Sequence, residues 1–214
     1  MGFFRDIANA VGSATGTPDH ALLRTGVLAR GEILGLDASG MTVQLGGGLV
    51  ERKCSITVSV MLDREPRYQA TVEQRIPEVY LPQLASGAAV VAVRVDPADR
   101  SRIALDLATP VPVVHRPFAP GELGPAWILQ NGAPVTVVLV ASAETGLLDA
   151  DDNPIQLLTL TVATGVPVPY QTQTPNSVPA SALPLVYPGS KLHARVATNP
   201  QVVIVDWAAG PVTA

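Results

Sequence analysis

The amino-acid sequence predicts an all-β protein of two tandem small β-barrel domains, preceded by a short N-terminal amphipathic helix. Three observations predict it: a stretch of about 80 residues that occurs twice, short apolar strands between turn residues, and helical spacing of the first apolar residues. The expected segments are an amphipathic helix and flexible leader at 1–18, a first β-barrel repeat at 19–107, a proline-rich linker at 108–125, a second β-barrel repeat at 126–207 and a tail at 208–214.

The duplication is recognised by matching residues that keep the same order in both halves. The anchor pairs are Gly26 with Gly132, Tyr68 with Tyr170, Pro77 with Pro179, Arg94 with Arg195, and Asp106 with Asp206. Their separation falls gradually from 106 to 100 residues, as it does when two copies of a domain have lost or gained residues only in their turns. Because a domain of this size buries only about 60–65 % of its unfolded surface, association between copies or with other subunits would add stability.

The N-terminal residues 1–14 have the pattern of an amphipathic helix. The apolar arc comprises Phe3, Phe4, Ile7, Ala8 and Val11. A helix of this length is marginal in water on its own, so it is expected to dock through Phe3, Phe4, Ile7 and Val11. Three docking places stay open: its own domain, a neighbouring subunit, or a membrane surface contacted peripherally by residues 1–14.

The first repeat is a succession of short strands rich in Val, Ile, Thr and Leu. The expected strands are 27–36, 41–45, 54–62, 68–75, 89–95 and 102–107, with turns at Ser39–Gly40, Gly46–Gly48, Glu65–Pro66, Ser86–Gly87 and Asp96–Pro97. Between the fourth and fifth strands, the spacing of Val79, Tyr80 and Leu84 predicts a short helical turn that plugs a barrel end. Five or six strands with such a plug indicate a small closed or half-closed barrel of the OB or SH3-like kind.

The linker and the second repeat follow the same reasoning. Five prolines between 108 and 125 predict a stiff, extended spacer. The strands expected in the second repeat are 135–141, 155–163, 169–174, 191–197 and 201–207.

A series of residues in the first repeat is similar to a group of uncharacterised bacterial small β-barrel domain proteins, here in tandem. The residues are Arg67-Tyr68-x-x-Thr71, Ile76-Pro77 to Leu81-Pro82, Gly87, Val93 to Asp99, and Ile103 to Asp106. The second repeat departs from this pattern where Ala197-Thr198-Asn199-Pro200 replaces the Val-Asp-Pro turn. The resemblance implies a fold and no activity, and it brings no catalytic residues to this chain. Many members of the group are membrane-associated.

Composition limits the classes of function. With a net charge of −4 and 4 % aromatic residues, the chain lacks the basic, ring-lined surface that binds nucleic acid, although Arg64, Arg67 and Arg75 with Tyr68 could form a small local patch. The single cysteine, Cys54, excludes an intrachain disulfide and is expected to be a half-buried thiol. We expect a cytoplasmic protein, since neither a signal peptide nor a membrane-spanning run is recognised.

The sequence contains no recognisable catalytic, cofactor or metal motif. His20, His115 and His193 lack metal-ligand spacing and are expected to be surface or hydrogen-bonded residues. The run from Asp149 to Asn153 resembles the start of a calcium loop but lacks the later glycine and glutamate, so a solvated hairpin loop is expected, with weak calcium binding as the alternative. The matched carboxylates Asp106 and Asp206 are expected to make turn hydrogen bonds.

The sequence therefore predicts a non-enzymatic structural or assembly protein that forms homo-oligomers or docks on a larger complex. The alternative is a module that binds a ligand, a peptide or a membrane surface in the cleft between the repeats. An enzyme without a local motif is the third reading, because catalytic groups can converge from distant positions. No cofactor is expected in the first two.

Overall fold

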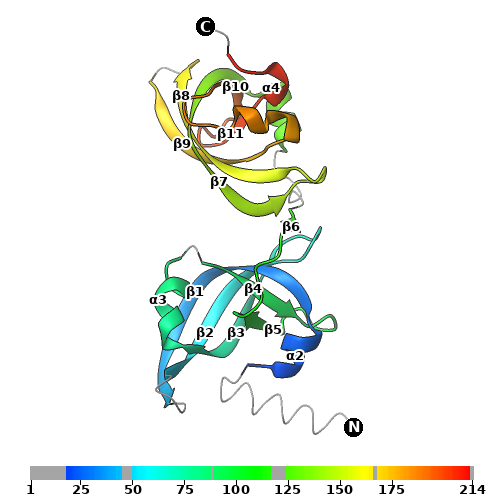
Figure 1. The fold of residues 1–214 in the computed structure, drawn as a ribbon, viewed down its shortest axis with the longest axis vertical. Coiled ribbons are helices and arrows are strands. Elements are labelled where there is room, and N and C mark those ends of the chain that lie inside the picture. The colour runs from blue at the N-terminus through cyan, green and yellow to red at the C-terminus, as the bar shows by residue number, and fades with distance from the viewer. Residues whose placement is uncertain (1–17, 45–49, 88, 117–123, 166–167, 213–214) are drawn as a thin grey trace. The chain divides into compact units, whose positions relative to one another are not determined.

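The computed structural model describes residues 18–44, 50–87, 89–116, 124–165 and 168–212. The chain is mostly β, with two antiparallel sheets, one of which is nearly barrel-shaped (Figure 1). It divides into two compact units, Met1–Val114 and His115–Ala214. The predicted N-terminal helix with Phe3, Phe4, Ile7 and Val11, and the predicted turn at Gly46–Gly48, lie outside the described residues.

In its described residues, the first unit contains a five-stranded sheet and three short helical segments. Its elements are α2 (His20–Thr25), β1 (Val27–Gln44), β2 (Val50–Met61), β3 (Tyr68–Pro77), the 3₁₀ helix η1 (Glu78–Tyr80), α3 (Leu81–Leu84), β4 (Val90–Val95) and β5 (Ile103–Asp106). The strand order is β3-β2-β1-β4-β5.

The second unit repeats this order of elements. The strand β6 (Val114–His115) lies at the boundary between the units. The elements that follow it are α4 (Pro125–Asn131), β7 (Ala133–Leu148), β8 (Pro154–Thr164), β9 (Tyr170–Ser177), η2 (Ala180–Leu185), β10 (Lys191–Val196), β11 (Val203–Val205) and η3 (Trp207–Ala209). The strand order β11-β10-β7-β8-β9 is that of the first sheet with each strand replaced by its counterpart, and β6 adds a further pairing to β7.

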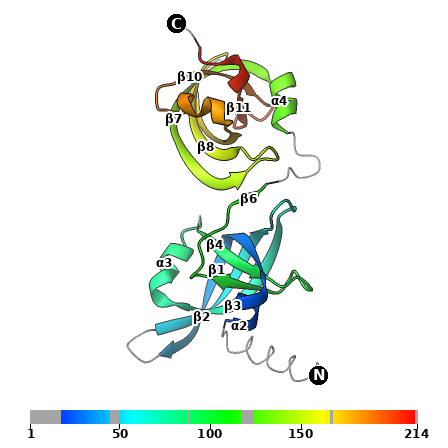
Figure 2. The same ribbon diagram turned by 45° about the vertical axis from the view of Figure 1, so that its right-hand side comes forward.

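The long strands β1 and β7 curve through their sheets, as Figures 1 and 2 show. The prediction of a turn at Ser39–Gly40 was wrong, because β1 continues through these residues with a shift of register between Ala38 and Thr42. A second shift lies between Ile33 and Gly35. Such β-bulges bend a strand without ending it, so one strand takes the place of two predicted ones.

The helices α2 and α4 were not predicted, and they occupy matching positions before the first long strand of each unit. Both end at a glycine, Gly26 or Gly132, where an added Cβ would lie 2.7 or 2.6 Å from a carbonyl oxygen of the helix. Each helix also buries one apolar side chain, Leu22 or Ile128. With only six and seven residues, these helices are too short for apolar periodicity to reveal them.

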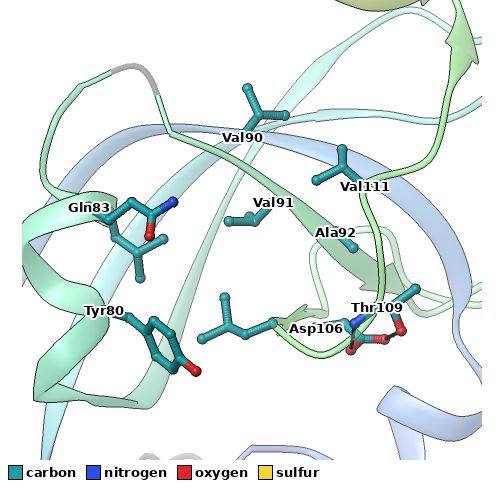
Figure 3. A pocket seen from close by; sticks show the side chains of 10 residues that line it. Tyr80, Gln83, Val90, Val91, Ala92, Asp106, Thr109 and Val111 are labelled. Carbon is teal, nitrogen blue, oxygen red and sulfur yellow. Dashed lines mark hydrogen bonds between the residues drawn. The ribbon is translucent and has the colours of Figure 1, made fainter.

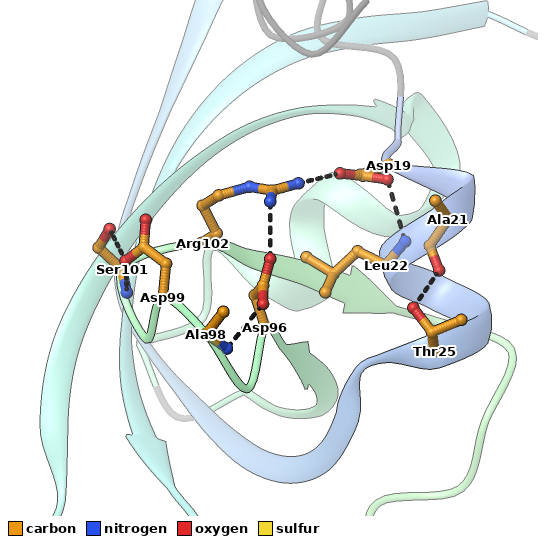
Figure 4. A network of polar contacts seen from close by, with 9 residues as sticks. All are labelled: Asp19, Ala21, Leu22, Thr25, Asp96, Ala98, Asp99, Ser101 and Arg102. Atoms are coloured by element: carbon orange, nitrogen blue, oxygen red, sulfur yellow. Dashed lines mark hydrogen bonds and ion pairs between the residues drawn. The ribbon is translucent and has the colours of Figure 1, made fainter. Parts of the chain in front are cut away.

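A polar network fastens α2 to the β4–β5 loop (Figure 4). The Asp19 carboxylate caps the helix by accepting a hydrogen bond from the Leu22 amide at 3.0 Å, and it also accepts one from Arg102 Nη2 at 2.8 Å. Arg102 Nη1 donates to Asp96 at 2.6 Å. Although burial raises the pKa of Asp19, the hydrogen bonds from Leu22 and Arg102 outweigh it and lower that pKa overall. The start of α2 is thereby fixed at the loop end of the β4–β5 hairpin.

The predicted helical turn after β3 is present, but it is only partly a plug. Leu84 is buried and belongs to the core of the first unit. Val79 and Tyr80, which were also expected to plug the barrel, are 73 % and 47 % exposed. The prediction failed for these two because η1 precedes α3 as a tighter turn and directs its side chains to solvent.

Each unit has its own hydrophobic core. Ile56, Val58 and Val93 are fully buried in the first, and Val137, Leu158 and Leu160 in the second. Cys54 is fully buried in the first core rather than half-buried as predicted, because β2 is covered on this face. Burial raises the pKa of the Cys54 thiol, which keeps it protonated and unreactive.

A buried side-chain amide joins the two outer strands of each sheet. In the first unit, Gln74 of β3 donates to the Leu105 carbonyl oxygen at 3.0 Å and accepts from the Leu105 amide at 2.9 Å. In the second, Asn176 of β9 donates to Val203 O at 3.0 Å and accepts from Val205 N at 2.8 Å. The amide thus satisfies buried backbone groups of the opposite outer strand, which would otherwise lack a partner.

Candidate functional site

The candidate site is a pocket of about 180 Å³ in the first unit, between α3, the start of β4 and the segment that follows β5. It is lined by Tyr80, Gln83, Leu84, Val90, Val91, Ala92, Asp106, Leu107, Thr109 and Val111. In Figure 3, Tyr80 and Gln83 stand on one side of it, and Thr109 and Val111 on the other.

The floor of the pocket is apolar and its rim is partly exposed. Leu84, Val91 and Ala92 are buried and continue into the protein interior. The apolar rim residues Tyr80, Val90 and Leu107 are 47, 37 and 39 % exposed. Covering such a surface with a partner's apolar group is favourable by roughly 25 cal/mol for each Å² of apolar surface buried.

The only acidic group in the lining, Asp106, is held by three donors. Its carboxylate accepts hydrogen bonds from Arg94 Nε at 3.0 Å, Thr109 N at 3.1 Å and Thr109 Oγ1 at 2.7 Å. Burial raises the pKa of Asp106, but the hydrogen bonds from Thr109 and Arg94 outweigh it and leave the pKa lowered. The ion pair with Arg94 cancels the charge, so the pocket presents no net charge to a partner.

Four of the ten lining residues have polar side chains. These are Tyr80, Gln83, Asp106 and Thr109. The Thr109 hydroxyl donates to the Asp106 carboxylate, and the lowered pKa of Asp106 makes this carboxylate a weak proton acceptor. Among the residues that the structure describes, no group of three or more His, Cys, Asp or Glu side chains could hold a metal ion. The arrangement is suited to binding an apolar group.

We expect Asp106→Asn to lower the stability of the first unit by about 1–2 kcal/mol at pH 7, because the ion pair with Arg94 is lost. The folded-state pKa of Asp106 lies below its ordinary value of 3.8, so its stabilisation is complete above that value and disappears as the pH falls through the folded-state pKa. The difference between wild type and variant should therefore shrink in acid. Thermal unfolding followed by circular dichroism at neutral and acidic pH measures it, with surface Asp63→Asn as control. An unchanged difference in acid would contradict this role.

The second unit has a larger side chain at the position aligned with Leu107. Trp207 follows Asp206 as Leu107 follows Asp106. The Trp207 side chain packs against the second core, and its Nε1 donates to Ser177 O at 2.7 Å. The chain after it stays on β10, with Val212 N donating to Lys191 O at 2.9 Å. The first unit has the smaller Leu107 at this position.

The residues matched between the two repeats make hydrogen bonds and packing contacts within their own units. Asp206 accepts a hydrogen bond from the Ala209 amide and Asp106 from the Thr109 amide, which confirms their turn role. Arg94 pairs with the Asp106 carboxylate, whereas Arg195 donates to the Gly132 carbonyl oxygen. Tyr68 and Tyr170 begin the outer strands β3 and β9 and pack on the two cores.

The remaining residues considered as possible metal ligands, the loop from Asp149 to Asn153 and the three histidines, lie outside the pocket. Asp149 accepts hydrogen bonds from the amides of Asp151 and Asn153 within the loop between β7 and β8, which confirms the hairpin loop. His115 Nε2 lies 2.7 Å from Asp152 Oδ1. His20 and His193 are exposed. The docking residues Phe3, Phe4, Ile7 and Val11 stay a prediction, since they lie outside the described residues.

The comparisons with known proteins do not assign a family. No protein-family model, no curated protein and no solved structure matches the chain. None of the helices in the described residues is long and apolar enough to cross a membrane.

Sequence reasoning did not single out the pocket. A signal was present in the duplication, because the separation of 100 residues that aligns Asp106 with Asp206 also aligns Leu107 with Trp207. Because leucine is smaller than tryptophan, this difference indicates that the side chains covering the two cores differ at this position. The pocket's other residues come from η1, α3, β4 and the segment after β5, and they could not be grouped without the fold.

Proposed function

We propose that this chain is a non-enzymatic assembly protein, built from two copies of one small β-barrel domain, that self-associates through the pocket of its first unit. The observation that carries the proposal is the partly exposed apolar rim of that pocket, Tyr80, Val90 and Leu107, at the place where the second unit packs Trp207 on its core. An exposed apolar depression indicates a docking site for a partner.

The domain-copy part of the proposal is supported by the strand order, by the amides Gln74 and Asn176, and by the glycines that end α2 and α4. The pocket is largely apolar and its one carboxylate is a weak proton acceptor, which favours assembly over catalysis. Low charge supports self-association too, because 15 % charged residues provide little repulsion between copies.

Light scattering across a wide concentration range tests the proposal. We expect wild type to reach a discrete mass that is a multiple of 22.2 kDa. Leu107→Trp fills the pocket with an indole, as Trp207 does in the second unit, and should weaken association by about tenfold or more, as expected for the centre of an interface. The matched control is Leu34→Trp, at a 48 % exposed leucine of β1 outside the pocket. A monomer at every concentration, or equal effects of the two variants, would contradict the proposal.

A further inference from the structure

We infer that the pocket of the first unit is filled by the helical turn η1–α3 of a second copy, and that two copies exchange this contact around a two-fold axis. Val79 of η1 and Pro82 of α3, here called the knob, enter the pocket of the other copy, and the contact is made twice. The inference rests on the proposed function, because it names the part of a second copy that occupies the same site.

The helical turn carries the knob directly beside the pocket. Tyr80, Gln83 and Leu84 of this turn line the pocket, and Figure 3 shows Tyr80 and Gln83 on its α3 side. Val79 and Pro82 have i, i+3 spacing, which places two residues of a tight helical turn on the same side. Both are exposed, and Val79, at 73 %, is the most exposed large apolar side chain of the described residues. An apolar projection and an apolar depression therefore lie side by side on one surface.

A surface with both parts is complementary to itself. In a two-fold contact both subunits use the same patch, so each knob meets the other copy's pocket and the two contacts are equivalent. A cavity of about 150 Å³ holds a benzene molecule, which is larger than a valine side chain, so a pocket of about 180 Å³ accepts the Val79 isopropyl group. A partner that offered only an apolar group to the pocket would leave Val79 exposed, whereas a second copy buries both parts.

The second unit differs at both parts of this surface. At the separation of 102 residues that applies to this part of the repeats, Ser181 stands in place of Val79 and Ala182 in place of Tyr80. Ser181 is exposed, and Ala182 is buried. The second unit thus has a polar side chain where the first has its knob, and a small buried one where the first has the rim of its pocket. The two parts change together between the units, as expected if they serve one contact.

Charge also permits two copies to meet at this surface. Glu78, which directly precedes Val79, forms an ion pair with Arg52 at 2.7 Å. Asp106, at the pocket, forms one with Arg94 at 3.0 Å. Each pair lies within one copy, so these residues bring no uncompensated like charges together when two identical patches approach, and such charges would oppose association.

Val79→Ser tests the knob, because serine is the residue of the second unit at this position. Val79 is exposed, so the variant should stay folded, which circular dichroism verifies. Burying a valine side chain strengthens association by about tenfold, so loss of both contacts should weaken the dimer by about a hundredfold in light scattering. The matched control is Val168→Ser, at a 71 % exposed valine of the second unit, and it should associate like wild type. Association of Val79→Ser equal to that of Val168→Ser would overturn the inference, and if Leu107→Trp still weakens association, the proposed function stands.

A mixture of two variants tests the exchange of contacts. Val79→Ser keeps an open pocket and lacks the valine of the knob, whereas Leu107→Trp keeps the knob and has a filled pocket. Each homodimer loses both contacts and a mixed dimer keeps one, so the mixed dimer should be weaker than wild type by only about tenfold. Fluorescence anisotropy of labelled Val79→Ser measures the mixed dimer in a titration with unlabelled Leu107→Trp, and a titration with unlabelled Val79→Ser is the control. Equal affinities in the two titrations overturn the inference, while weakened association of Leu107→Trp alone would keep the pocket as the self-association site. A wild type that is monomeric at every concentration overturns both proposals.

Discussion

Replacing Gln74 by leucine is expected to destabilise the first unit by about 2–6 kcal/mol, because two buried backbone groups lose their partner. Leucine is apolar and cannot hydrogen bond with the Leu105 amide and carbonyl, which Gln74 contacts at 2.9 and 3.0 Å. Each unsatisfied buried group costs about 1–3 kcal/mol, against a typical total stability of about 5–15 kcal/mol. The first unit should therefore unfold at a much lower denaturant concentration.

Two spectroscopic signals separate the units in this experiment. Both tryptophans, Trp127 and Trp207, belong to the second unit, so their fluorescence follows its unfolding alone. Circular dichroism reports both units. Gln74→Leu should produce an early transition in circular dichroism that tryptophan fluorescence does not show, whereas Asn176→Leu should move the fluorescence transition. Gln69→Leu, at an exposed residue of β3, is the control and should change stability by about 0.5 kcal/mol or less. Equal effects of Gln74→Leu and Gln69→Leu would show that the amide does not stabilise the sheet.

Replacing Gly31 by alanine is expected to destabilise the first unit by about 1–3 kcal/mol through overpacking. A Cβ at this position would lie 2.4 Å from Val93 Cγ2 and 2.8 Å from Val58 Cγ1, distances that real Cβ atoms do not adopt. Both valines are fully buried and have no room to withdraw. The glycine is thus required by the close approach of side chains from β2 and β4 to the centre of β1.

Gly35→Ala on the same strand is the matched control. No atom lies within 4 Å of a Cβ built there, so alanine should be neutral or stabilising by about 0.5–1 kcal/mol. Urea unfolding followed by circular dichroism compares the two variants. The double variant Gly31→Ala with Val93→Ala should recover part of the loss, because it returns the space that the new methyl group occupies. A loss in Gly31→Ala no larger than in Gly35→Ala would contradict the packing argument.

The strands were the predictable part of the fold, because alternating apolar residues and turn residues act locally. Strands β3, β4 and β10 were placed close to their observed bounds for this reason. Ser39–Gly40 misled the prediction, since a bulge and a turn favour the same residues and only pairing with β2 distinguishes them. The helices α2 and α4 were not predicted, because each buries only one apolar residue, Leu22 or Ile128, and one residue makes no periodic pattern.

The candidate site was not predictable to the same extent, because it depends on residues distant in sequence. Asp106 was recognised as a turn residue, and its hydrogen bonds to Thr109 are local. Its pairing with Arg94, and the meeting of Tyr80 with Leu107, follow from the packing of α3, β4 and β5. The difference between Leu107 and Trp207 was visible when the two copies were aligned. Only the structure shows that Leu107 lines a pocket whereas Trp207 packs on the second core.

The division of strand pairing has a consequence for biosynthesis. Strands β1 to β5 form one sheet, and β6 to β11 form the other. The first sheet is therefore complete before the second unit, His115–Ala214, has been translated, which takes about 5–20 s at about 5–20 residues per second. Small β domains fold in about milliseconds to seconds. Emergence from the ribosome thus gives the first half time to sequester its strands before similar strands of the second half appear, and it limits mispairing between the two. Refolding of the full-length chain from denaturant lacks this order, so it should yield more misfolded and aggregated product than synthesis does.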